Sequence, residues 1–188
     1  MRLDFLNAVE TVEIDGKEYA INTDFLVWIE IEQLFFDSET TESERFARIL
    51  ALAYPILPDN PVGAIEKVLW FYAGRNKGTG KKSSTLSAPA YDLSRDFEYI
   101  WAGFLGEFGV DIAKTHMHWW RFKTLLSCLS EDSKFFKIVS YRSMDTSSIK
   151  NKELRRFYER MKKQFKLPDL RNSDEREKET VYKLESFF

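Results

Sequence analysis

Residues 93–108, LSRDFEYIWAGFLGEF, carry the clearest helical pattern in the chain. Apolar side chains recur there every three or four residues, which places them on one face of a helix. They are Leu93, Phe97, Ile100, Trp101, Phe104, Leu105 and Phe108. We expect Asp92 to cap the start of this helix and Gly109 to end it, because glycine readily adopts the left-handed backbone of a helix terminus. The stretch predicts an amphipathic helix that contributes one face to the core.

The next run, residues 116–123 (HMHWWRFK), is rich in aromatic side chains. A helix over about 116–129 would place Trp119 and Phe122 on one apolar face. Ser130 or Asp132 would then start a shorter helix that holds Phe135, Phe136, Ile138, Val139 and Tyr141. Because the two aromatic stripes are the strongest in the sequence, we predict that they meet. The predicted core residues are Trp101, Phe104, Trp119 and Phe122.

The first 74 residues predict a hairpin followed by three helices. Residues 12–21 alternate around Asp15-Gly16, a pair that suits a tight β-hairpin turn. Helices are expected over 24–37, 41–54 and from Asn60 to about Gly74. Thr41 with Glu44 would form a capping box, and Pro61 suits the first position of a helix.

Glu32 lies on an otherwise apolar face of the first predicted helix, near Phe25, Trp28 and Phe36. A carboxylate in apolar surroundings is costly unless it is paired. One interpretation is an edge glutamate that reaches water. The other is a buried partner for an arginine, and Arg142 is the candidate.

Two charged stretches suggest surfaces rather than core. Residues 75–90 contain four cations, glycines and serines but no acid, which predicts a flexible basic linker. Residues 150–166 contain eight cations and two acids opposite an apolar stripe. Such a helix face is usually solvated, but it can also dock an acidic partner.

The last segment, 169–188, begins with a charge run and ends with four apolar residues at helical spacing. They are Val181, Leu184, Phe187 and Phe188. An apolar strip of this kind should dock, so we treat it as a candidate partner-docking element that could link copies into a homo-oligomer.

These patterns predict a mainly α protein, a helical bundle of about six to seven helices with a short N-terminal β-hairpin. Residues 1–74 would form the hairpin and a helical lobe, and 75–90 a flexible basic linker. Residues 91–168 would form a C-terminal helical lobe within the same compact domain, and 169–188 a charged tail with an apolar tip.

The sequence offers no assembled catalytic or metal-binding constellation. His116 and His118 are two residues apart and diverge on a helix, so they cannot easily share a metal. Gly80-Lys81 resembles a phosphate loop only superficially, because Arg75 and Lys82 occupy positions where the motif needs glycine and a hydroxyl. Cys128, the single cysteine, is expected to be a buried small apolar residue. We expect no enzyme activity, cofactor or metal.

The bulk composition points to a cytosolic protein. The net charge is −2, which argues against specific nucleic-acid binding. Charge is nevertheless uneven, since residues 1–60 contain 13 acids and 4 bases, a net charge of −9. The start of the chain lacks an apolar signal region, and no run approaches the length of a membrane span.

Several ordered segments resemble one known family. They include 96–105 (DFEYIWAGFL), 108–112 (FGVDI), 118–122 (HWWRF), 141–145 (YRSMD) and 166–169 (KLPD). Together they resemble the bacteriophage proteins known as gene product fifteen, found in siphophages and prophages of Gram-positive bacteria. The resemblance covers about residues 1–170.

The resemblance implies a role in tail assembly. In such phages the gene lies in the tail module, ahead of the tape measure gene, which resembles the slot of tail assembly chaperones. The expected function is therefore a non-virion chaperone that binds the tape measure protein in the host bacterial cytoplasm. The alternatives are a structural virion component, such as a tail completion or connector protein, and a host-directed regulator.

Overall fold

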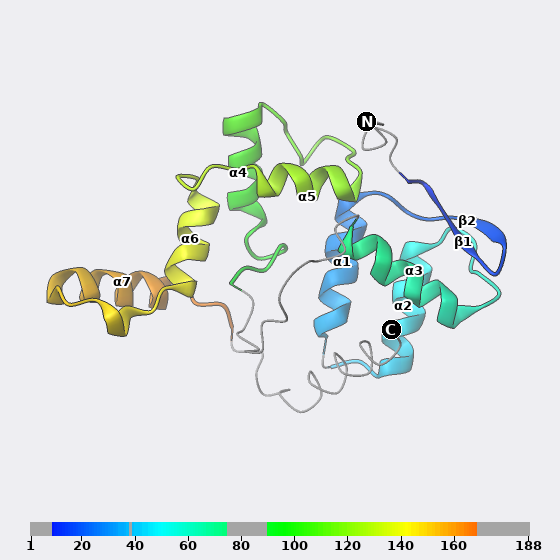
Figure 1. Ribbon diagram of the computed structural model, residues 1–188, viewed down its shortest axis with the longest axis horizontal. Helices are drawn as coiled ribbons and strands as arrows, with labels where there is room; N and C mark the ends of the chain where they lie inside the picture. Colours follow the sequence, from blue (N-terminus) through cyan, green and yellow to red (C-terminus); the bar gives the residue numbers. More distant parts are fainter. Residues whose placement is uncertain (1–8, 38, 75–89, 169–188) are drawn as a thin grey trace. The chain divides into compact units, whose positions relative to one another are not determined.

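The computed structural model describes residues 9–37, 39–74 and 90–168 (Figure 1). The chain divides into two compact units. Unit one holds the described residues up to Gly74 together with residues 116–123, and unit two holds residues 90–115 and 124–168. The predicted C-terminal lobe, 91–168, therefore differs from unit two, because residues 116–123 group with the N-terminal elements.

The fold class is confirmed: the described residues form seven α-helices and one β-hairpin. Strands β1 (Thr11–Ile14) and β2 (Lys17–Ala20) pair antiparallel with Val12 opposite Tyr19. Asp15 and Gly16 have φ angles of 50° and 77°, the left-handed pair that a type I′ turn requires. Ile14 points toward α3, where a Cβ added at Gly63 would lie 3.0 Å from its side chain. Glycine therefore permits this close packing.

Unit one contains three helices, of which the second and third start at the expected residues. They are α1 (Phe25–Phe36), α2 (Glu42–Ala53) and α3 (Pro61–Ala73). Thr41 and Glu44 form the predicted capping box on α2. Asn60 accepts a hydrogen bond from the Gly63 amide, and Pro61 opens α3 as expected.

Unit two is built from α4 (Phe97–Phe108), α6 (Lys134–Ser143), η1 (Thr146–Ser148) and α7 (Lys152–Gln164). Gly109 ends α4 with a φ of 66°, as predicted. The helix starts four residues later than the apolar pattern suggests. The Asp92 carboxylate instead accepts hydrogen bonds from the Ser94 and Arg95 amides, which holds that segment in a turn.

Helix α5 (Trp119–Ser127) begins in unit one and is shorter than the expected 116–129. Residues 116–118 are extended because they pair with the start of α1. The Phe25 amide donates to the Met117 carbonyl at 2.9 Å, and the Trp119 amide donates to the Thr23 carbonyl at 2.7 Å. This backbone pairing draws 116–123 into unit one.

Candidate functional site

The core of unit one is a stack of aromatic rings. Trp28 lies 4.7 Å from Phe71 and 6.3 Å from Trp119, measured between ring centroids. Trp119 in turn stacks on Phe122 at 5.8 Å, and Phe122 on Phe25 at 4.7 Å. All five side chains are almost completely buried. Stacked rings of this size bring both large apolar burial and specific ring–ring attraction.

The C-terminal end of α3 is closed by side chains of α5. The Trp120 indole donates to the Phe71 carbonyl at 2.7 Å, and the Trp119 indole donates to the Tyr72 carbonyl at 3.0 Å. The Lys123 ammonium donates to the carbonyls of Tyr72 and Ala73 at 2.9 and 3.1 Å. The last carbonyls of a helix have no hydrogen-bond partner within the helix, and they lie at the negative end of its dipole. Burial lowers the pKa of Lys123, and the nearby Glu32 carboxylate opposes that shift.

Glu32 and Arg142 have different partners from those expected. The Tyr72 hydroxyl donates to Glu32 at 2.6 Å, so the carboxylate is hydrogen-bonded and half-buried in unit one. Arg142 belongs to unit two and pairs with Asp96. Each member of the possible Glu32–Arg142 pair thus has a partner within its own unit that the sequence pattern did not identify.

The two histidines have structural contacts. His118 Nδ1 accepts a hydrogen bond from the Trp120 amide at 3.1 Å, and Nε2 lies 3.1 Å from the Val9 carbonyl. Since Nδ1 accepts, Nε2 must carry the proton that it donates to Val9. Burial lowers the pKa of His118, in keeping with a neutral ring. His116 is exposed and lies 3.2 Å from the Asp24 carboxylate.

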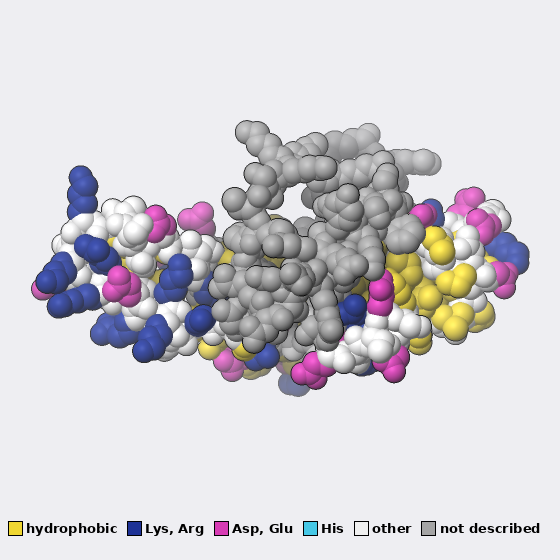
Figure 2. Space-filling view, turned by 90° about the horizontal axis from the view of Figure 1, so that it is seen from below, with side chains coloured by type: hydrophobic (Ala, Val, Ile, Leu, Met, Phe, Trp, Pro, Cys, Tyr) yellow, Lys and Arg dark blue, Asp and Glu magenta, His cyan; other side chains and the backbone are white. Residues whose placement is uncertain are grey.

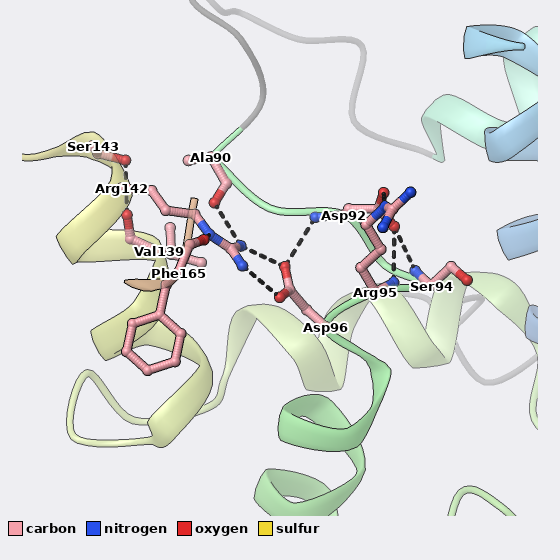
Figure 3. Close-up of polar contacts among 9 residues, drawn as sticks. All are labelled: Ala90, Asp92, Ser94, Arg95, Asp96, Val139, Arg142, Ser143 and Phe165. Atoms are coloured by element: carbon pink, nitrogen blue, oxygen red, sulfur yellow. Dashed lines mark hydrogen bonds and ion pairs between the residues drawn. The ribbon is translucent and has the colours of Figure 1, made fainter. Parts of the chain in front are cut away.

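Unit two holds a buried ion pair that the sequence did not reveal (Figure 3). The Arg142 guanidinium donates to both carboxylate oxygens of Asp96, at 2.6 and 2.8 Å. It also donates to the carbonyls of Ala90 and Phe165, while the Asp92 amide donates to Asp96. One arginine thereby joins the segment before α4, the start of α4, α6 and the end of α7. Asp96 is the N-terminal flanking residue of α4, and its carboxylate makes no cap because it serves this pair.

The four predicted core residues fall into both units. Trp119 and Phe122 lie together in unit one, whereas Trp101 and Phe104 lie in unit two. Phe104 is fully buried, and the centroid of its ring lies 5.6 Å from that of Phe108. Trp101 is half-buried, and its indole donates to Asp111 at 2.8 Å.

Cys128 is exposed, contrary to expectation. Helix α5 ends at Ser127, so the helical periodicity that predicted burial no longer applies to the next residue. Within the three described ranges, no group of His, Cys, Asp and Glu side chains is arranged to hold a metal ion.

Among the described residues, exposed apolar side chains occur on both units. In unit one, Ile56, Leu57 and Val62 are 77%, 58% and 58% exposed. In unit two, α7 leaves Leu154 and Phe157 exposed beside its cations. Figure 2 shows the Lys and Arg side chains gathered over α7 and hydrophobic side chains over the end of unit one that carries the hairpin.

Two predicted elements lie outside the described residues: residues 75–89 of the basic linker predicted over 75–90, and the tail 169–188 with its apolar tip of Val181, Leu184, Phe187 and Phe188. Among the helices that are described, none has the length and apolar character that crossing a membrane requires.

Comparison with known proteins gave one family match. A family model described as Bacteriophage Gp15 protein matches residues 6–167, which include every described element. Neither a curated protein nor a solved structure matched the chain. The match begins before the hairpin and ends just after α7, so it spans both units. This chain therefore belongs to the bacteriophage Gp15 protein family.

Proposed function

We propose that this protein is a phage tail assembly chaperone. It would bind the tape measure protein in the host bacterial cytoplasm and be absent from the mature virion. Family membership supports the phage context, and the gene order that the resemblance implies, ahead of the tape measure gene, supports a role in the tail. The observation that carries the proposal is the exposed apolar surface of unit one formed by Ile56, Leu57 and Val62, here called the 56–62 surface.

The 56–62 surface is held in place by its neighbours. The buried Tyr54 hydroxyl donates to the Ala64 carbonyl at 2.8 Å, which fixes the start of the loop to α3. At the other end, the Lys17 ammonium donates to the Asp59 carboxylate at 2.7 Å and the Asn60 side-chain amide donates to the Asp15 carboxylate at 2.9 Å, so the loop is also tied to the hairpin. Pro55 and Pro58 restrict the backbone between these anchors.

A fixed apolar surface of this kind fits a helical client. Exposed apolar patches on soluble proteins commonly mark protein-binding sites. An amphipathic helix can lay its apolar side chains on such a surface without any catalytic group. Because the anchors already order Ile56 and Leu57, binding would lose little additional conformational entropy. The tape measure protein, a long helical client, offers many segments of this type.

The test is capture of the tape measure protein by the full chain after coexpression. We expect Ile56→Ser with Leu57→Ser to lower the retained tape measure protein by at least about tenfold, equivalent to about 1.4 kcal/mol. Leu105→Ser is the matched control, since Leu105 is 43% exposed on unit two. Equal capture by both variants and the unchanged chain would contradict a role for the 56–62 surface, and no capture by the unchanged chain would contradict the chaperone role.

Mass spectrometry of purified virions separates the chaperone from the alternative, a tail completion or connector protein. A chaperone should be abundant in the infected lysate and absent from virions. A fixed stoichiometric amount in virions would instead identify a structural component.

A further inference from the structure

We propose that copies of this chain associate head to tail, with α7 of one copy docked on α1 of the next. The inference goes beyond the proposed function, because contact between copies does not require a client. It rests on two exposed faces that carry apolar side chains and opposite charges.

The α7 face is only half covered within its own unit. The ring of Tyr141 on α6 packs against three rings, with centroid distances of 6.3 Å to Phe157, 6.1 Å to Tyr158 and 6.1 Å to Phe165. That packing still leaves Leu154 46% and Phe157 38% exposed.

Two cations border this uncovered edge. The helical repeat places Arg156 and Arg160 on the side of Phe157 that faces away from Tyr158. The Arg160 guanidinium lies 5.7 Å from the centre of the Phe157 ring. The edge is therefore an apolar strip with arginines along one margin, a combination that suits a partner with apolar and acidic side chains.

Helix α1 presents such a partner. Leu26, Glu30 and Gln33 recur at helical spacing and are all exposed, with Leu26 50% exposed. Phe36, farther along the helix, is 44% exposed. By contrast, the acid beside the 56–62 surface, Asp59, is already paired with Lys17 at 2.7 Å. Of the two apolar surfaces of unit one, α1 is the better match for arginines.

The wider charge distribution agrees with this pairing. Residues 1–60 contain 13 acids and 4 bases, whereas residues 152–164 contain six cations and two acids. Complementary fields of this kind raise association rates and fix orientation. The rim ion pairs add little affinity, so the apolar side chains Leu154, Phe157 and Leu26 must supply most of it.

A contact between two different surfaces leaves one free surface of each kind on every dimer. Heterologous contacts therefore continue into rings or open chains instead of closing at a dimer. The expected behaviour is a mass that rises with protein concentration and falls with salt, because salt screens the charges that align the faces.

The test is sedimentation velocity on the full chain and its variants. We expect Arg156→Glu with Arg160→Glu to reduce the mass to the 22.2 kDa of one chain, with an unchanged circular dichroism spectrum. Lys150→Glu with Lys166→Glu makes the same change in net charge at exposed positions outside α7 and should leave association intact. A second single-face variant, Leu26→Ser with Glu30→Gln, removes the apolar side chain and the charge without creating a new cation, and it should also be monomeric.

Mixing the two monomeric variants is decisive. Each retains the face that the other lacks, so an equimolar mixture should form a one-to-one dimer and nothing larger. A chain that stays monomeric at all concentrations overturns the proposal. So does self-association of the α1 variant, which would indicate contact between two α7 helices. Loss of association only when 179–188 is deleted would overturn it too, in favour of tail docking. None of these results depends on capture of the tape measure protein.

Discussion

The two units stabilise the junctions between their helices in different ways. In unit one, the carbonyls at the end of α3 accept hydrogen bonds from two indoles and one ammonium. In unit two, a single buried guanidinium serves a carboxylate and two carbonyls. The first arrangement adds polar contacts to a large apolar core, whereas the second depends on one charge that cannot be lost without stranding another. Their responses to substitution should therefore differ.

The largest effect should follow removal of the central ring of unit one. Trp119→Ala deletes a side chain that is 1% exposed and leaves a cavity between Trp28 and Phe122. We expect a loss of about 3–5 kcal/mol in the free energy of unfolding. Urea denaturation followed by circular dichroism measures it. Trp70→Ala is the control, because Trp70 is 39% exposed and its loss should cost about 1 kcal/mol or less. Equal losses for both variants would mean that the stack is not the core.

Breaking the buried pair of unit two should cost slightly less. Arg142→Ala leaves the Asp96 carboxylate, 2% exposed, without its countercharge. We expect about 3 kcal/mol, the lower end for a buried pair, because the arginine side chain is itself 10% exposed. Replacing both residues, Asp96→Leu with Arg142→Met, should restore much of the loss. Arg95→Ala, at an exposed arginine, should change stability by less than about 0.5 kcal/mol. A double variant no more stable than Arg142→Ala would contradict the ionic explanation.

Glu32 should give an intermediate result. In Glu32→Gln the amide oxygen can still accept from the Tyr72 hydroxyl, but the charge that favours Lys123 is lost. We expect a loss of about 1 kcal/mol, the typical difference between a hydrogen bond to a charged acceptor and one to a neutral acceptor. Glu30→Gln, at an exposed position of the same helix, is the matched control. If the two variants have the same unfolding midpoint, Glu32 behaves as a surface residue.

Local signals in the sequence were sufficient for the parts of the fold that depend on neighbouring residues. Asp15-Gly16 specified the hairpin turn, Thr41 with Glu44 the start of α2, and Gly109 the end of α4. Each acts within four or five residues, so the one-dimensional pattern contains the whole interaction.

The missed features all depend on distant residues. Arg142 and Asp96 are 46 positions apart, and nothing near either residue marks the other as its partner. Residues 116–118 have an aromatic pattern compatible with a helix, yet they are extended because the backbone of Thr23 and Phe25 pairs with them. The candidate binding surfaces were also partly hidden, since only the packing on α6 determines which part of the α7 stripe stays uncovered.

The smallest effect concerns His118 and appears only on acidification. Its Nδ1 accepts from the Trp120 amide and its Nε2 donates to Val9, so protonation of Nδ1 would replace an accepted hydrogen bond with a repulsion. Burial lowers the pKa of the folded ring below its usual 6.5. The unfolded state therefore binds the proton more readily than the folded state does. Stability should be greatest above about pH 6.5 and should fall as the pH is lowered from there toward the folded-state pKa. Urea midpoints at a series of pH values between about 7 and 5 measure this slope.

His118→Gln should be less stable at neutral pH but should have a shallower slope, whereas His116→Gln should retain the slope of the unchanged chain. If His118→Gln also retains the full slope, the acid sensitivity arises elsewhere and the neutral-ring assignment loses its support.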